Sequence, residues 1–211
     1  YSADREAGKT VVFGVELLSS SVKTDIDSSY FDRLPSHYTV REIFDKDNNI
    51  YSYIVSEQMR LMATYPSFVD LLARGYNNAA VKVFELKDPA MIEIHNLKRR
   101  YGVQAETFFD PDNRLLTNAY LLLNQAARVM SQYPEIMIEV GVHTDNAASP
   151  AASLRLSQQR AEAMVDYLVS TGMDRSRIVA RGYGDRHPVA ANYLEEGRGQ
   201  NRRIDLVILK R

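Results

Sequence analysis

The segment Ile136-Met137-Ile138-Glu139-Val140-Gly141-Val142-His143-Thr144-Asp145-Asn146 decides the fold of the second half of this chain. Isoleucine or valine occupies every second position from 136 to 142, which is the pattern of a β-strand with one buried face. Asp145 follows two residues after this strand ends, so we expect its carboxylate at the carboxyl edge of a sheet.

A helix is predicted after this strand, and an arginine lies within it. Residues 153–170 place apolar side chains at helical spacing, and Gly172 stands just past their end. Leu156 and Arg160 are four residues apart and share one face of this helix. Arg160 can therefore point back over the end of the strand.

Asp145 and Arg160 permit two interpretations. They could form a salt bridge with each other, which would add at most about 1 kcal/mol if it is exposed. They could instead hold the ammonium and the carboxylate of an amino-acid-like ligand, with a bidentate contact from the guanidinium. The spacing alone leaves both interpretations open.

Periodicity also predicts the elements around this pair. Residues 115–133 carry apolar residues at helical spacing and stop at Pro134, while residues 177–181 and 203–209 read as short strands. Strands that alternate with helices indicate a layered α/β sandwich. We expect a βαβαβ domain with a mixed sheet over residues 105–211.

The first half reads as a second small domain, a βαββαβ unit of residues 10–86, so the predicted fold class is α+β with two small α/β sandwiches. A polar turn at residues 45–49 joins the middle two strands into a hairpin. Pro35 is expected to end the first helix, Pro66 to open the second, and Gly75 to follow it. The predicted strands are residues 11–18, 38–44, 50–55 and 79–84, and the predicted helices are residues 28–34 and 67–74.

Residues 87–104 are predicted to be a connector. Asp88-Pro89 interrupts the chain, and Lys98-Arg99-Arg100 forms a basic cluster. We interpret this cluster as a solvated face, with a glycan or phosphate contact as the alternative.

Composition limits the classes of partner. The formal net charge of -1 gives no bulk attraction to nucleic acid or to an anionic membrane. No apolar stretch approaches the roughly 20 residues of a membrane helix. The absence of cysteine excludes disulfides and thiolate metal sites, and it fits an oxidising compartment. The sequence shows no signal peptide and no initiator Met, so we expect Tyr1 to begin a processed or truncated chain.

An enzyme is the first rival interpretation, and the sequence gives it little support. Asp110, Asp112 and Glu139 could be paired carboxylates for glycoside cleavage. Glu139, however, lies within a strand and away from the loop that carries the aspartates. The four histidines show no metal-ligand spacing such as HExxH, and there is no nucleophile elbow or phosphate-binding glycine loop. We therefore predict no catalysis, no metal and no cofactor.

Several motifs in order resemble the OmpA-like peptidoglycan-binding domain of porin tails, peptidoglycan-associated lipoproteins and flagellar stator proteins. The resemblance covers about half of the chain. The motifs are Phe109-Asp110 followed by Leu115, His143-Thr144-Asp145, Leu156-Ser157-x-x-Arg160-Ala161, Gly182-Tyr183-Gly184 with Pro188, Asn192, and Asn201-Arg202-Arg203-Ile204.

The resemblance implies a ligand, the diaminopimelate of the peptidoglycan stem peptide. Asp145 would accept its ammonium and Arg160 would hold its carboxylate, while Asp110 and its neighbours would supply backbone donors. The implied supporting residues are Phe109, Asp110, Thr144, Asn146, Leu156, Asn201 and Arg202. For Thr144 and Asn146 a role in the turn is the alternative, and Arg202 could be a solvated charge at a strand start. His143 would be a structural hydrogen-bonding residue.

The sequence departs from the family pattern at three places. Val142 stands where the family usually has glycine, Ala148 replaces a loop glycine, and Ser153 replaces an asparagine. Loss of a glycine can change the backbone angles of a loop, and Ser153 would remove an amide from the rim of the site.

The order of elements in residues 10–86 resembles the SPOR domain, a ferredoxin-like βαββαβ module of cell-envelope proteins. Many such modules bind glycan strands on the face of their sheet. The resemblance therefore implies that Tyr38, Tyr51 and Tyr53 could stack on sugars, although packing within the protein is the common fate of strand aromatics.

Together these observations predict a periplasmic protein, associated with the outer membrane or the cell wall, that binds peptidoglycan non-covalently and anchors an envelope protein or complex. The alternative is an interaction module that keeps the fold without binding the ligand and serves assembly of an envelope complex. Envelope proteins are the further expected partners, a homodimer is one open assembly, and nucleic acid is not an expected partner.

Overall fold

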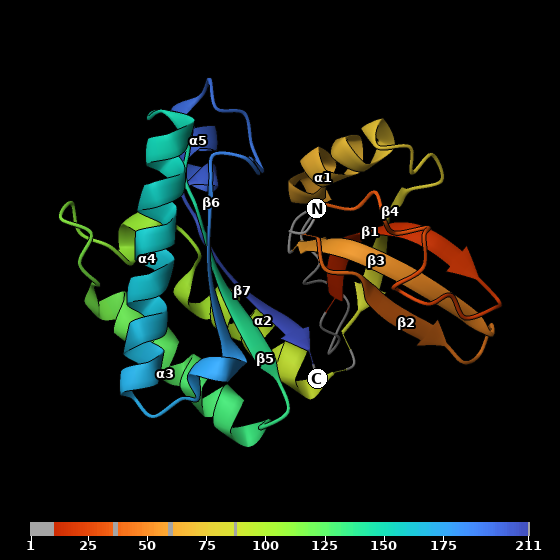
Figure 1. Cartoon of the computed structure of the whole chain (residues 1–211), viewed down its shortest axis with the longest axis horizontal. Helices are drawn as coiled ribbons and strands as arrows, with labels where there is room; N and C mark the ends of the chain where they lie inside the picture. The colour runs from red at the N-terminus through yellow and green to blue at the C-terminus, as the bar shows by residue number, and fades with distance from the viewer. Residues whose placement is uncertain (1–10, 36–37, 59–60, 87, 211) are drawn as a thin grey trace. The chain divides into compact units, whose positions relative to one another are not determined.

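A computed structural model describes residues 11–35, 38–58, 61–86 and 88–210 (Figure 1). The chain divides into two compact units, Tyr1–Leu86 and Lys87–Arg211. Each has its own sheet and its own hydrophobic core. The predicted α+β fold class is confirmed.

Unit 1 contains one antiparallel sheet in the strand order β2-β3-β1-β4. In this order β3 lies between β1 and β2, and β1 lies between β3 and β4, as in a split βαβ arrangement. The hairpin of β2 and β3 is confirmed, since Asp45 pairs with Ile50 across the turn. The elements are β1 (Val11–Ser20), β2 (Arg41–Asp45), β3 (Ile50–Gln58), α1 (Leu61–Ala73) and β4 (Ala80–Glu85).

In unit 1 the first predicted helix is absent from the described residues, and the second is present but begins earlier than predicted. Residues 28–34 form consecutive turns, in which the amide of Phe31 donates to the carbonyl of Ser28 and that of Leu34 donates to the carbonyl of Phe31. Serine and aspartate side chains compete with the backbone and favour turns over helices. Helix α1 begins before Pro66, which lies inside it. Pro66 leaves the carbonyl of Met62 without its helical donor, and Met62 is 71% exposed.

The core of unit 1 contains aromatic residues that sequence analysis placed on a sugar-binding face. Tyr53 is fully buried, and its hydroxyl accepts a hydrogen bond from the amide of Thr24 at 2.6 Å. Tyr38 and Tyr51 are half-buried and pack against this core. Tyr53 is therefore unavailable for stacking on a sugar. The buried cluster consists of Val15, Leu17, Phe31, Tyr53, Val55, Leu71 and Tyr76.

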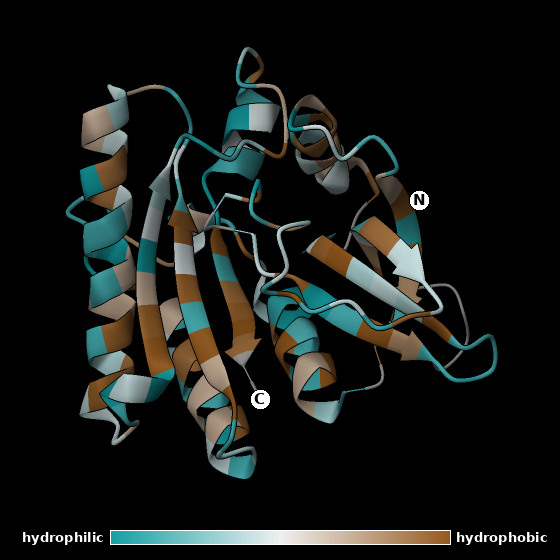
Figure 2. Cartoon of the chain, turned by 45° about the vertical axis from the view of Figure 1, so that its right-hand side comes forward, coloured by the Kyte–Doolittle hydropathy of each residue, from teal (hydrophilic) through white to brown (hydrophobic). Residues whose placement is uncertain are grey.

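Unit 2 contains a three-stranded mixed sheet in the order β6-β5-β7. Strand β5 runs parallel to β6 and antiparallel to β7. Figure 1 shows α4 and α3 beside this sheet, and Figure 2 shows hydrophobic residues alternating with hydrophilic ones along its strands. The main elements are α2 (Pro89–Tyr101), α3 (Thr117–Gln132), β5 (Met137–His143), α4 (Pro150–Ser170), β6 (Ile178–Gly184), α5 (Glu195–Asn201) and β7 (Ile204–Lys210).

The predicted strand period places one apolar row in the core. Ile138, Val140 and Val142 of β5 are fully buried, and they pair with Ile208, Leu206 and Ile204 of β7. Side chains of α3 and α4 complete the same cluster. Two short 3-10 helices, η2 (Ala105–Thr107) and η3 (Arg175–Arg177), precede α3 and β6.

The predicted connector, residues 87–104, contains helix α2. The carboxylate of Asp88 caps it by accepting hydrogen bonds from the amides of Ala90 and Met91. Ala90 and Ile94 are buried in the core of unit 2. The basic cluster is not uniformly solvated, because Lys98 lies 3.4 Å from Asp205 of β7 and is mostly buried. This helix is therefore part of the second core and not a spacer.

Within the described residues, no helix combines the length and the apolar character that crossing a membrane requires.

Candidate functional site

Asp145 lies on the loop after β5, and both of its carboxylate oxygens already have a partner. Oδ2 accepts a hydrogen bond from Nη1 of Arg202 at 2.5 Å, and Oδ1 accepts one from the amide of Ala147 at 3.1 Å. The residue is 8% exposed. An ionised carboxylate has about four acceptor positions, so each oxygen can accept one further hydrogen bond.

Arg202 joins Asp145 to two other carboxylates. Its Nε pairs with Glu106 of η2, and its Nη2 lies 2.7 Å from Glu195 of α5. Burial opposes the charge on this guanidinium, but hydrogen bonds to Glu106, Glu195 and Asp145 outweigh burial and raise the pKa of Arg202. The alternative interpretation of Arg202, a solvated charge at a strand start, is wrong, because its guanidinium is held in three ion pairs.

Arg160 projects from α4 and is held by neutral groups. Its Nε donates a hydrogen bond to Oδ1 of Asn113 at 2.9 Å, and its guanidinium lies 4.9 Å from the centre of the Phe109 ring. Burial is the largest influence on the pKa of Arg160 and lowers it. Among the described residues, its two Nη nitrogens have no hydrogen-bond or ion-pair partner. They are the paired donors that a carboxylate accepts in a bidentate contact.

Asp145 and Arg160 form no ion pair with each other in the part of the chain that the structure describes. Each is held by a separate group, Asp145 by Arg202 and Arg160 by Asn113. The site therefore offers a carboxylate and a guanidinium that do not neutralise one another.

The loop before α3 braces Arg160. Phe109 bridges to Leu115, and Asp110 closes the loop by accepting a hydrogen bond from the amide of Arg114 at 2.8 Å. The amide of Asp110 donates to the carbonyl of Arg114, so it is not available as the backbone donor that the resemblance implied. Asn113 adopts a positive φ of 64°, a conformation that asparagine tolerates better than most residues.

The other supporting residues lie in different environments. Thr144 is buried, its amide donates to the carbonyl of Gly184, and its hydroxyl oxygen has no hydrogen-bond partner among the described residues. Asn146 is exposed and Leu156 is half-buried.

Asn201 is fully buried. Its Oδ1 accepts hydrogen bonds from the amides of Val189 and Ala190, and its Nδ2 donates to the carbonyl of Ala190 and the side chain of Asn192. Asn201 therefore fixes the loop between β6 and α5, and with it the position of Arg202.

Two of the departures from the family pattern, Ala148 and Ser153, neither strain the backbone of the loop after β5 nor change the edge of the candidate site. Ala148 is exposed and does not adopt a positive φ, so its loop does not require glycine there. Ser153 is 1% exposed, and its backbone faces Gly184 of β6. The expectation that Ser153 lies at the rim of the site was wrong.

A buried polar cluster that the sequence patterns did not indicate lies beside this edge of the sheet. His143 stacks on Tyr183 with ring centres 4.6 Å apart, and its Nε2 lies 3.3 Å from Asp205. Burial, followed by the charge of Arg203, lowers the pKa of His143 to about 3, so the ring is neutral. Burial opposes ionisation of Asp205, but Lys98, His143 and Arg203 together lower the pKa of its carboxyl.

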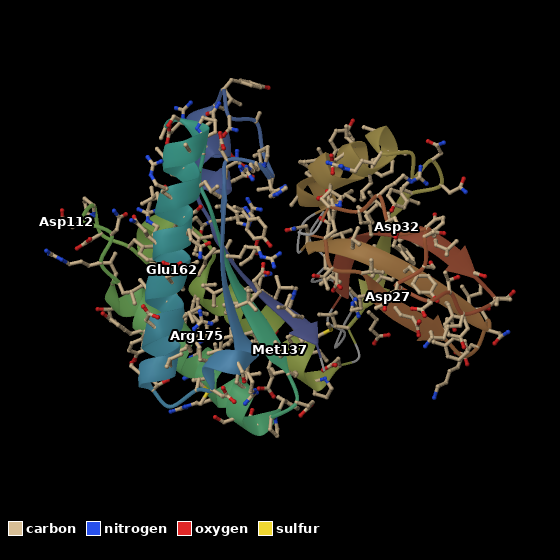
Figure 3. The ribbon with its side chains drawn as sticks, viewed as in Figure 1. Asp27, Asp32, Asp112, Met137, Glu162 and Arg175 are labelled. Atoms are coloured by element: carbon tan, nitrogen blue, oxygen red, sulfur yellow. The ribbon has the colours of Figure 1, made fainter. Side chains whose placement is uncertain are left out.

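The carboxylates considered for glycoside cleavage are separate. Figure 3 shows Asp112 at the tip of the loop before α3, directed away from the sheet. Glu139 is buried within β5, where it pairs with Arg181 at 3.2 Å and accepts a hydrogen bond from Tyr183. In the described part of the chain, no group of three or more histidine and acidic side chains is arranged to hold a metal ion.

Comparison with known proteins assigns the family of this part of the chain. Residues 108–202 match the OmpA family. They form an OmpA family domain, and the resemblance read from the motifs is confirmed.

Two similar proteins each match less than half of this chain. The chain is 40% identical over 104 residues to outer membrane porin F of Pseudomonas fluorescens, which covers 49% of this chain and 32% of the porin. It is 35% identical over 94 residues to the peptidoglycan-binding protein ArfA of Mycobacterium tuberculosis, over 44% of this chain and 29% of that protein. The chain thus spans about a third of the length of these relatives.

A solved structure of a MotB-like protein from Desulfovibrio vulgaris has the same fold, with a TM-score of 0.50 and 20% identity. The match covers 58% of this chain and 90% of that one.

Proposed function

We propose that the OmpA family domain of this chain binds peptidoglycan without covalent chemistry and thereby anchors an envelope protein or complex to the cell wall. The ligand group is the diaminopimelate of the stem peptide. Arg160 holds its carboxylate, and Asp145 accepts its ammonium. The peptidoglycan-binding protein ArfA, which is 35% identical over the matched region, supports this proposal.

The observation that carries the proposal is that the Arg160 guanidinium has no ion-pair partner among the described residues. Its guanidinium is braced by the Asn113 amide and the Phe109 ring, both uncharged, and its Nη donors have no partner among the described residues. The charge of Glu106 acts on Arg160 from a distance, and a half-buried cation without a paired counter-ion is costly. A ligand carboxylate would supply that counter-ion and the bidentate contact that guanidinium groups favour.

The proposed location is the periplasm, at the outer membrane or the wall, where the ligand is found. The proposal needs no catalytic group and no cofactor. Modest affinity is sufficient for anchoring, because many sites on one polymer can engage many copies of the protein at once.

Co-sedimentation with purified diaminopimelate-type peptidoglycan tests the proposal. We expect the wild-type protein to pellet with the polymer and Asp145→Ala and Arg160→Ala to remain in solution. Arg155→Ala and Asp166→Ala are matched controls, because both residues are exposed on the same helix, α4. Failure of the wild type to pellet would favour the assembly-module alternative. Pelleting that survives both site substitutions would place the wall contact elsewhere in the chain.

A further inference from the structure

Arg202 gathers three carboxylates that come from three separate segments of unit 2. Glu106 belongs to η2, Asp145 follows β5, and Glu195 opens α5. Like charges repel, and each of the three carboxylates pairs with a different nitrogen of Arg202, so Arg202 is what holds them together. The backbone of Arg202 is also fixed, since its carbonyl accepts a hydrogen bond from the amide of Ala105 at 2.8 Å.

The charge in this cluster is not balanced. Its three carboxylates are Glu106, Asp145 and Glu195, and its two guanidinium groups are Arg202 and Arg198, which pairs with Glu195. Among these ion-paired groups, three negative and two positive charges leave one negative charge in excess, and Arg160 interacts with Glu106 from a distance without pairing with it. The cluster therefore has the charge to attract one further cation, and each Asp145 oxygen keeps one acceptor position that no described residue uses.

We propose that Arg202 is a positioning residue that gives the site its preference for a ligand with a free ammonium group. This inference rests on the proposed function. Arg202 holds Asp145 at the edge of the cluster, with one acceptor position per oxygen open to the ligand. Without Arg202, repulsion from Glu106 and Glu195 moves the Asp145 carboxylate away, and the local amide of Ala147 is then its one remaining partner among the contacts described above.

Isothermal titration with two soluble peptides tests this role. One is a muramyl tripeptide that ends in diaminopimelate, and the other is the same peptide with its free side-chain amine acetylated. We expect Arg202→Gln to lower affinity for the free-amine peptide about tenfold, equivalent to ~1.4 kcal/mol. Affinity for the acetylated peptide should not change. Arg202→Lys keeps the charge but has a single donor group, so it should restore part of the loss.

A double-variant comparison separates positioning from general damage. Asp145→Asn should reduce the same preference, and Asp145→Asn combined with Arg202→Gln should lose no more than Asp145→Asn alone. Arg155→Gln is the matched control, because Arg155 is exposed on α4 and takes no part in the ion pairs of the cluster. Thermal unfolding of each variant verifies that it is folded.

Three results would overturn the inference. Arg202→Gln could weaken both peptides equally, which is the signature of a structural role. It could strengthen binding of the free-amine peptide, which would mean that Arg202 competes with the ligand. The losses in the double variant could also be additive. In each case the wild type still binds, so the proposed function stands. A wild type that binds neither peptide and does not pellet with peptidoglycan would refute the proposed function itself.

Discussion

Gly182 of β6 and Gln158 of α4 meet backbone to backbone. A Cβ atom added to Gly182 would lie 2.2 Å from the backbone nitrogen of Gln158. The contact is reinforced by a hydrogen bond of 2.7 Å from the amide of Gly182 to Oε1 of Gln158. Two residues on, the amide of Gly184 donates to the hydroxyl of Ser157. The glycines of this motif therefore allow α4 to lie directly on β6, which sets the position of Arg160.

Gly182→Ala should destabilise unit 2 by about 3 kcal/mol, because the backbone of α4 cannot yield as a side chain would. Gly199→Ala is the control, because a Cβ atom added to Gly199 would meet its nearest neighbour, Nη2 of Arg202, at 3.7 Å, which is an ordinary van der Waals distance. Urea unfolding measures both free energies. Equal stability of the two variants would contradict the close approach of α4 to β6.

Arg177 closes the carboxyl end of α3. Its Nη2 donates to the carbonyls of Met130 and Tyr133 at 2.7 and 2.9 Å, and its Nε donates to that of Ile136 at 3.1 Å. Arg177→Met should cost about 2 kcal/mol of stability, since it leaves these carbonyls without charged donors. Arg177→Lys should cost nearly as much, because one ammonium cannot reproduce the fork. A lysine variant as stable as the wild type, measured by thermal unfolding, would argue against this geometry.

His143 should make the protein less stable in acid. Its pKa is lowered from 6.5 to about 3 in the folded state, so between these values the unfolded chain binds a proton that the folded chain does not. Stability therefore falls as the pH decreases from 6.5 towards 3, by an amount on the order of a few kcal/mol. Lowering of the Asp205 pKa adds a loss in the same direction below pH 3.8.

Urea unfolding from pH 7 to pH 4 measures this dependence. His143→Gln removes the titrating ring and should flatten the curve in this range. If the variant and the wild type lose stability in parallel, His143 is not the group responsible.

Asn113 should control binding through Arg160. Asn113→Asp keeps the size of the side chain but places a negative charge beside the Arg160 guanidinium. The new carboxylate competes with the ligand carboxylate, so affinity for the diaminopimelate peptide should fall about tenfold. Asn113→Gly accommodates the positive φ and removes the hydrogen bond alone, so it should cost less. Titration of both variants tests this order, and an aspartate variant that binds as well as the glycine variant would contradict it.

Sequence patterns predicted the elements with strong periodicity. The apolar repeats of α3 and α4 and the alternation in β5 each correspond to an observed element. Helix α5 was not predicted, because Gly197 and Gly199 lower helix propensity. Helix α2 was read as a connector, because its basic residues obscured the apolar face of Ala90 and Ile94.

The site was predictable in its motifs and not in its contacts. Motif order identified Asp145 and Arg160, but their spacing could not distinguish a mutual salt bridge from two separate partners. Arg202 and Asn113 are those partners, and they lie 57 and 47 residues away in sequence from the groups they hold. Pairings at such distances depend on the packing of whole elements, which local patterns do not specify.

These long separations have a consequence for how the chain matures. Glu106 and Arg202 are 96 residues apart, so the cluster closes once the first and last segments of the domain have come together. Contacts of this kind form late, because the entropy of closing long loops must be overcome first. The binding site is therefore complete only in the fully folded domain. A partly folded copy would lack it and would not bind the cell wall.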